Sequence, residues 1–290
     1  MYLCNQWRDY EVLDTGDGEK LERWGEIVLR RPDPQVIWPK ADPALWAQAQ
    51  AIYERSDVGG GHWNFTQKLP ERWIVTLDDL RFYVKPTGFK HTGLFPEQAA
   101  NWAFMRERIR SAGAFQEPPR ILNLFAYTGG ATLACAAAGA QVTHVDAAKG
   151  MVLWARENRD LSGIPEASTR FIIEDAKAFV RRELRRGSRY DGILMDPPSY
   201  GRGPNGEVWK LENELYELVD LCAQALSDTP LFFLINGYTT GFSACVLRNL
   251  VEKCVVARLG GKAEADELAL AVTSGGVLPC GTTARWLPNA

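Results

Sequence analysis

The sequence lacks the marks of a membrane or secreted protein. No run of about 18 uncharged apolar residues occurs, which excludes a conventional membrane-spanning helix. The first eleven residues, MYLCNQWRDYE, lack the basic start and apolar run of a secretory signal. The six cysteines show neither CxxC pairs nor zinc-ligand spacing. We therefore expect a soluble, cytoplasmic protein with reduced thiols.

The chain also carries little excess charge. Its 290 residues include 33 Lys and Arg against 36 Asp and Glu, a net charge of −3. This argues against a protein whose whole surface binds nucleic acid, but it leaves room for a local basic patch. With 46% hydrophobic and 24% charged residues, the composition is that of a globular protein with a substantial core.

The two parts of the chain differ in composition and in hydrophobic pattern. Residues 1–95 hold six of the ten tryptophans and many turn signals, which predicts a small β-rich N-terminal domain. Residues 97–112 have helical periodicity, so 96–117 is expected to be a linking helix. In the N-terminal part we expect strands at 10–13, 26–30 and 73–77, and turns at 14–20 and 78–79.

Residues 118–290 alternate short apolar runs with longer helical stretches. Continuous apolar strands separated by helices predict a parallel sheet covered on both faces, an α/β Rossmann-like doubly wound domain. The expected strands are 121–126, 141–146, 170–175, 190–196 and 231–236, and the expected helices are 131–139, 149–163, 176–187 and 213–227.

Polar residues and glycines follow four of these strands directly. The first run is followed by a glycine-bearing turn that includes Gly129, the second by Asp146 seventeen positions later, and the next two by Asp175 and Asp196. Ligands of open α/β sheets bind at the carboxyl ends of the strands, although each Asp alone could equally be a helix N-cap. The GxGxxG pattern of NAD enzymes is absent, because residues 125–130 read FAYTGG. The pattern therefore favours S-adenosylmethionine (SAM) as the ligand.

Three motifs carry a family resemblance. NLFAYTGG (123–130), VDAAKGMVLWARENRDLSG (145–163) and ILMDPPSYGRGPNGEVW (193–209) resemble bacterial class I SAM-dependent methyltransferases related to large-subunit (23S) rRNA methyltransferases. FKHTGLFPEQAANW (89–102) and VLPCGTTARW (277–286) extend the resemblance. It implies a helper segment around Phe95 and Gln98 that closes over the cofactor. The cofactor-binding residues that we predict are Phe95, Gln98, Asn123, Phe125, Tyr127, Thr128, Gly129, Asp146, Ala147, Glu174, Asp175 and Asp196.

The Asp-Pro-Pro turn is the predicted catalytic element. SAM carries its own activated leaving group, so the enzyme mainly aligns the nucleophile, the methyl group and the sulfur. The Asp196 carboxylate and the Pro197 carbonyl can accept the hydrogens of an amine, with Pro198 stiffening the turn, and Tyr200 can stack on a flipped base. The alternative is that the turn only ends a strand.

Methylation at carbon 5 of cytosine is disfavoured. In relatives that perform it, a cysteine thiolate follows the fifth strand, and here Asn236 or Gly237 stands at that place. Cys222 and Cys245 fall within predicted helices and are expected to be buried packing residues, and Cys280 is a poorer candidate. An exocyclic amine or a ring nitrogen fits better. His91 and His144 have no partners of metal-ligand type, so no metal is expected.

The leading hypothesis is methylation of RNA, most naturally ribosomal RNA. Methylation of a protein or small molecule, and a non-catalytic SAM- or RNA-binding assembly factor, stay open as alternatives. The basic segment 181–189 could bind phosphates or only offset a helix dipole. The aromatic residues His62, Trp63 and Phe65 beside glycines 59–61 could stack on bases or only pack. The target atom, the oligomeric state and the role of the N-terminal domain are left open.

Overall fold

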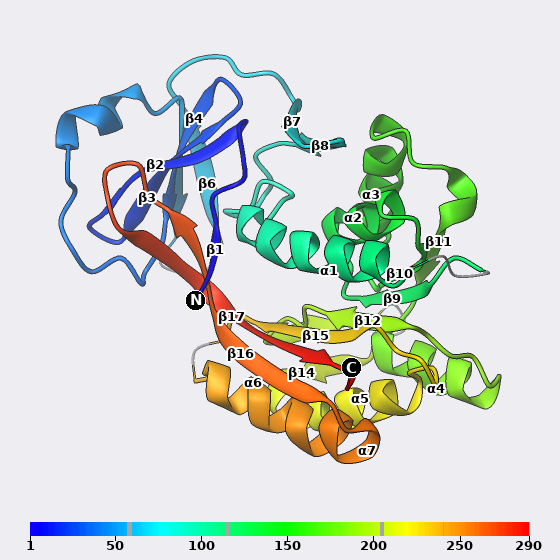
Figure 1. Cartoon of the computed structure of the whole chain (residues 1–290). Coiled ribbons are helices and arrows are strands. Elements are labelled where there is room, and N and C mark those ends of the chain that lie inside the picture. The colour runs from blue at the N-terminus through cyan, green and yellow to red at the C-terminus, as the bar shows by residue number, and fades with distance from the viewer. Residues whose placement is uncertain (57–59, 114–116, 204–205, 240, 290) are drawn as a thin grey trace. The chain divides into compact units, whose positions relative to one another are not determined.

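The computed structural model describes residues 1–56, 60–113, 117–203, 206–239 and 241–289 (Figure 1). The chain forms two compact units. The Rossmann unit comprises Met1, Ala100–Glu267 and Gly281–Ala290, and the β unit comprises Tyr2–Ala99 and Leu268–Cys280. These bounds differ from the predicted division at 95 and 117. The Rossmann unit includes nearly all of the predicted linking helix, and the β unit also includes the C-terminal segment Leu268–Cys280.

The Rossmann unit is built on five parallel strands. These are β9 (Arg120–Leu124), β10 (Gln141–Asp146), β11 (Thr169–Ile173), β12 (Gly192–Met195) and β15 (Phe232–Gly237). Their order is β15-β12-β9-β10-β11, and β17 (Val277–Leu287) pairs antiparallel with β15. β17 is followed in the sheet by β16 (Lys262–Ala271) and β1 (Tyr2–Cys4). The strands β12 and β15 are buried along their whole length, as the continuous apolar runs predicted.

Helices cover both faces of this sheet, which confirms the doubly wound α/β fold (Figure 1). On one face lie α1 (Ala99–Ser111), α2 (Gly130–Ala137) and α3 (Lys149–Leu161). On the other lie α4 (Ala176–Arg185), α5 (Leu211–Gln224), α6 (Ala244–Val251) and α7 (Ala257–Leu259), with a π-helical turn at Glu252–Val256 before α7. Among the described residues, no helix has the length and apolar character needed to cross a membrane.

An apolar core joins the sheet to the helices α4, α5 and α6. Phe179 of α4, Leu218 of α5 and Phe233 of β15 are fully buried in it. Helical periodicity directs Phe179 and Leu218 inward, because residues three and four apart share one face of a helix. Phe233 lies on a strand that is buried along its whole length. Burial of a large apolar side chain stabilises a fold by about 1.5–3 kcal/mol.

The β unit holds a five-stranded sheet in chain order. Its strands are β2 (Tyr10–Gly16), β3 (Glu19–Trp24), β4 (Ile27–Pro32), β5 (Ala51–Arg55) and β6 (Gly61–Phe65). β7 (Trp73–Leu77) and β8 (Leu80–Val84) form a separate hairpin around the predicted turn at 78–79. Short 3-10 helices lie at Pro43–Gln48, Pro96–Gln98 and, in the Rossmann unit, Glu166–Ser168.

The predicted turn over 14–20 was too long. Only Asp17 and Gly18 form the turn, since β2 runs to Gly16 and β3 begins at Glu19. Both turn residues have positive φ, 53° and 78°. This backbone is typical of the tight two-residue Asp-Gly hairpin, whose twist matches that of the strands it joins.

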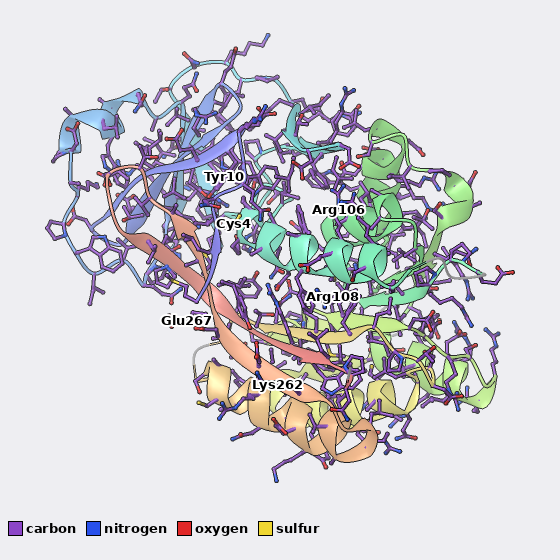
Figure 2. The ribbon with its side chains drawn as sticks, in the orientation of Figure 1. Cys4, Tyr10, Arg106, Arg108, Lys262 and Glu267 are labelled. Atoms are coloured by element: carbon purple, nitrogen blue, oxygen red, sulfur yellow. The ribbon has the colours of Figure 1, made fainter. Side chains whose placement is uncertain are left out.

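A buried ion pair lies inside the β unit. Arg31 donates to both carboxylate oxygens of Glu22, at 2.6 and 2.7 Å, and Tyr10 donates its hydroxyl at 2.6 Å (Tyr10 is labelled in Figure 2). Burial alone would raise the pKa of Glu22, but Arg31 and Lys20 outweigh it and lower this pKa to about 2. The fully enclosed carboxylate therefore remains ionised.

We expect Glu22→Gln to destabilise the protein by about 3–5 kcal/mol, because it leaves the buried Arg31 charge without its partner. The stability that the depressed pKa contributes is present above the ordinary value of 4.5 and is lost as pH falls toward 2. Chemical denaturation at neutral pH and thermal melting across this acid window measure both effects, with the exposed Glu26→Gln as control. Equal stability of the two variants would contradict the assignment.

Candidate active site

The strand order reverses at β9, which is where open α/β sheets bind their ligands. β10 and β11 lie on one side of β9, and β12 and β15 lie on the other. The carboxyl ends of these strands carry the loop 125–129, Asp146, Asp175 and Asp196. The sheet thus brings to one edge the residues that the sequence placed after separate strands.

The loop that joins β9 to α2 has an unusual backbone. Phe125, Tyr127 and Gly129 have φ values of 55°, 50° and 90°. Non-glycine residues in this left-handed region cost of order 1 kcal/mol, and such strain gathers at ligand sites. At Gly129 a Cβ atom would also lie 3.0 Å from the Cβ of Ala155. The tight turn therefore needs glycine for its φ and for its close approach to α3.

Asp146 is held by this loop and by the start of α3. The Tyr127 N–H donates to Oδ2 at 2.9 Å, and the Ala148 N–H donates to Oδ1 at 2.8 Å. Burial raises the pKa of Asp146 above its ordinary value, although both N–H groups oppose the shift. The two bonds fix the orientation of the carboxylate at the end of β10. Ala147 stands between Asp146 and Ala148 in the chain.

Asn158 is a positioning residue that the sequence analysis missed. It is fully buried on α3 and donates Nδ2 to the carbonyl oxygen of Thr128 at 2.9 Å. The bond ties the loop to the helix beside it. The available signal was a polar residue on the buried stripe of α3, one turn after Ala155.

Asn123 lies in a polar network beneath the loop. Its Nδ2 donates to Thr132 Oγ1 at 2.9 Å, and that oxygen lies 2.9 Å from His144 Nδ1. Burial, with a smaller effect of Arg156, lowers the pKa of His144 to about 3, so the ring is neutral. The contact of Asn123 with the cofactor stays a prediction. Among the described residues, no three His, Cys, Asp or Glu side chains cluster as metal ligands would.

Asp175 caps helix α4. Its Oδ1 accepts a hydrogen bond from the Ala178 N–H at 2.9 Å, so the N-cap interpretation holds for this oxygen. Glu174 forms an ion pair with Arg182, and its N–H donates to the Asp146 carbonyl at 3.2 Å. The third strand end is therefore tied to the second. Roles of both acids toward a cofactor stay predictions.

The Asp196-Pro197-Pro198 turn is anchored by Trp209, another residue that the sequence analysis missed. Trp209 Nε1 donates to the Pro198 carbonyl at 2.6 Å. The buried Trp209 ring also packs on Phe125, with 5.0 Å between ring centroids. One side chain thus joins the predicted catalytic turn to the cofactor loop. Its only sequence signal was its place at the end of the DPPSYGRGPNGEVW motif, of which 204 and 205 lie outside the described residues.

Tyr200 lies on a short hairpin directly after this turn. The hairpin pairs β13 (Tyr200–Arg202) with β14 (Val208–Lys210). The Leu211 N–H donates to the Ser199 carbonyl at 3.1 Å, which fastens the hairpin to the start of α5. The Tyr200 side chain is 52% exposed. An exposed ring on an anchored hairpin can meet a substrate from solvent.

Phe95 and Gln98 belong to the β unit. Their segment is fastened there, because the Pro96 carbonyl accepts bonds from Trp7 Nε1 at 2.9 Å and from Cys4 Sγ at 3.2 Å. Phe95 packs on the His91 ring, with 5.2 Å between centroids. The predicted helper role of this segment stays a prediction.

The thiols do not support covalent catalysis. All six cysteines, each within the described residues, are free, and burial raises the pKa of Cys222 and Cys280. The prediction that Cys245 is buried was wrong. Leu247 and Val251 lie on the buried face of α6, and Cys245 lies on its exposed face. At the end of β15, Asn236 accepts a bond from Asn101 Nδ2 at 2.9 Å.

Residues in two sequence candidates for RNA contact have structural partners. In the basic segment 181–189, Arg181, Arg182 and Arg186 form ion pairs with Glu217, Glu174 and Glu183, as expected of a charged helix end. Trp63 packs on Tyr53 and donates Nε1 to the Thr87 carbonyl at 2.8 Å. His62 and Phe65 are exposed, and position 59 lies outside the described residues.

The chain carries acidic residues at the carboxyl ends of the strands of a doubly wound sheet, and comparison with known proteins identifies its class. Residues 46–223, more than half of the chain, match the family described as S-adenosylmethionine-dependent methyltransferase. The chain belongs to this family, and its cofactor is SAM.

Individual relatives agree with that class. The chain is 26% identical, over 77% of its length, to "Ribosomal RNA large subunit methyltransferase K" of Neisseria meningitidis, and spans 64% of that protein. A SAM-dependent methyltransferase from Agrobacterium tumefaciens matches with a TM-score of 0.94 and 37% identity, over 99% of this chain and 93% of that one. SMU.776 complexed with SAH, at 18% identity and TM-score 0.73 over 98% of this chain and 76% of that one, shares the fold.

Proposed function

We propose that the protein transfers the methyl group of SAM to an amine or ring nitrogen of RNA, with ribosomal RNA as the substrate. The observation that carries this proposal is the bond from Trp209 to Pro198, which holds the Asp-Pro-Pro turn against the loop that begins at Phe125. A nucleophile held by the turn would then lie beside a cofactor held by the loop. In-line methyl transfer requires that alignment.

The residues at the strand ends fit SAM. The Asp146 carboxylate, oriented by two backbone N–H groups, is suited to accept hydrogen bonds from the two ribose hydroxyls. The left-handed turn at Gly129 leads directly into α2, whose first N–H groups suit a carboxylate. Phe125, Tyr127 and Thr128 belong to the same loop and would also contact the cofactor. Asp175, next to the bonded pair Glu174 and Asp146, would face the adenine.

The chain's own residues would position the nucleophile. When bound, SAM supplies an activated methyl group on a positively charged sulfur. The Asp196 carboxylate and the Pro197 carbonyl would accept the N–H hydrogens of the target and aim its lone pair. Pro198 keeps the turn rigid, and its carbonyl is already bonded to Trp209. Stacking of a base on the exposed Tyr200 would contribute about 1–3 kcal/mol.

Two observations support an RNA substrate and a nitrogen target. The Neisseria relative is named as a ribosomal RNA methyltransferase, and further relatives with such names match over 20–26% of their length. No cysteine stands at the end of β15, whose last two residues are Asn236 and Gly237, and burial raises the pKa of the Cys222 thiol. Carbon-5 chemistry would need a thiolate there. A ribosomal substrate would place the protein in the cytoplasm.

We expect Trp209→Phe to lower kcat by about tenfold while SAM affinity stays nearly unchanged. The ring packing on Phe125 is retained, but the turn loses one hydrogen bond, worth about 0.5–1.5 kcal/mol. Trp286→Phe is the matched control, because Trp286 Nε1 donates to the Gly260 carbonyl at 2.8 Å, outside the proposed site. Steady-state kinetics and calorimetry separate the two effects. Equal losses of kcat in both variants would show a general effect of stability.

The decisive experiment is transfer of labelled methyl from SAM to separated RNA, protein and metabolite fractions of a strain that lacks the gene. We expect label in ribosomal RNA, and digestion would then identify the base and atom. Label only in protein or metabolites would show that the substrate is a protein or a small molecule and would overturn the RNA proposal. SAM binding without any transfer would favour a non-catalytic assembly factor.

A further inference from the structure

The β unit exposes two phenylalanine side chains. Phe65, at the end of β6, is 54% exposed, and Phe89, in the segment after β8, is 68% exposed. Single exposed apolar residues are ordinary on protein surfaces, but aromatic residues gathered on one face with cations are typical of a binding surface.

The strand register and one tryptophan place them together. Tyr53 pairs with Trp63 and Ala51 pairs with Phe65, so Trp63 and Phe65 project from the same face of the β5–β6 pair. Trp63 Nε1 donates to the Thr87 carbonyl at 2.8 Å and to the Phe89 carbonyl at 3.3 Å. The loop that carries Phe89 is therefore fastened to the face that carries Phe65.

One cation lies on the same face, and a second follows Phe89 in the fastened loop. Arg55 pairs with Gly61 two positions along the ladder from Tyr53, so its exposed side chain projects from this face. Lys90 is held in place by Arg31, which donates Nη1 to the Lys90 carbonyl at 2.9 Å. Burial, and then the charge of Lys20, lowers the pKa of Lys90 to about 8, with Arg31 and Arg55 adding to the effect. Asp33 opposes this shift. Glu22 and Asp33 pair with Arg31 and Lys20, so Arg55 and Lys90 are the cations that suit a phosphate here.

We propose that Phe65, Phe89, Arg55 and Lys90 form a stacking patch that binds a single-stranded segment of the RNA substrate. The two rings would stack on bases and the two cations would contact phosphates, the combination that holds single strands without reading their sequence. A duplex is a poorer ligand, because its bases are stacked inside and leave nothing for the rings. The inference rests on the proposed function, since it takes the substrate to be RNA.

Binding of a labelled oligonucleotide tests the aromatic half of the patch. The probe is a fluorescein-labelled oligouridine of about ten nucleotides, measured by fluorescence anisotropy. The double variant Phe65→Ala, Phe89→Ala should weaken binding by at least about tenfold, since it removes both rings on which bases would stack. The matched control is Ile37→Ala, which removes a side chain that is 88% exposed in the same unit.

Salt and pH test the cationic half. The double variant Arg55→Gln, Lys90→Gln should reduce the slope of log affinity against log salt by about 1.4, whereas the exposed Lys253→Gln should not. Wild-type affinity should fall as pH rises through 8, because Lys90 loses its charge there, and Lys90→Arg should remove this fall. The other groups around Lys90 are Lys20, Arg31, Asp33, Arg55 and His91. Burial lowers the pKa of His91 to about 4, so this ring does not titrate in that range.

The outcomes separate this inference from the proposed function. If the aromatic double variant binds as tightly as wild type while wild type methylates RNA, the stacking patch is wrong and the proposed function stands. If wild type neither binds nor methylates RNA, the proposed function fails and the patch fails with it. A salt slope unchanged by the charge variants would overturn the role of Arg55 and Lys90.

Discussion

Asp146→Ala should abolish SAM binding, weakening it by at least about 100-fold. The carboxylate would accept hydrogen bonds from both ribose hydroxyls, and bonds to a charged group contribute about 1.5–3 kcal/mol each. Its removal also leaves the N–H groups of Tyr127 and Ala148 without their acceptor, so the loop that faces the cofactor loses its anchor. Isothermal titration calorimetry with SAM measures the effect directly.

Asp191→Ala supplies the matched control. Asp191 accepts two bonds at 2.7 Å, from the Arg120 N–H and the Ser227 hydroxyl, but it lies at the amino ends of β9 and β12. This variant should lose stability without losing SAM affinity. If Asp146→Ala bound SAM as tightly as wild type, or if both variants lost binding equally, Asp146 would not be the ribose ligand.

Asp196→Ala should have the opposite pattern, with SAM affinity nearly unchanged and turnover reduced by about 100-fold or more. Asp196 follows β12, and its proposed partner is the nucleophile rather than the main body of the cofactor. Its loss would leave a bound target without the acceptor that aims its lone pair. Single-turnover kinetics at saturating SAM, with calorimetry beside them, separate chemistry from binding.

A graded substitution sharpens this test. Asp196→Asn keeps one carbonyl acceptor in nearly the same shape, so it should retain more turnover than Asp196→Ala. Normal turnover in Asp196→Ala would show that the Asp-Pro-Pro turn only ends a strand. A large loss of SAM affinity would instead assign Asp196 mainly to the cofactor.

The two units differed in how far their sequences could be interpreted. In the Rossmann unit the strand predicted at 231–236 is β15 (Phe232–Gly237), because a strand buried on both faces appears as an unbroken apolar run. In the β unit, short half-exposed strands leave only a weak alternation. The pattern there missed β1, β3, β5, β6 and β8, and it overextended the turn at Asp17 and Gly18.

The sequence by itself determined the alternation of strands and helices and placed Gly129, Asp146, Asp175 and Asp196 at the ends of strands. Those features depend on local periodicity and on neighbours in the chain. Only the tertiary structure decided the strand order, the inclusion of 268–280 in the β unit, and the bonds from Asn158 to Thr128 and from Trp209 to Pro198. These join residues distant in sequence, and the packing that brings such residues together leaves no periodic trace in the chain.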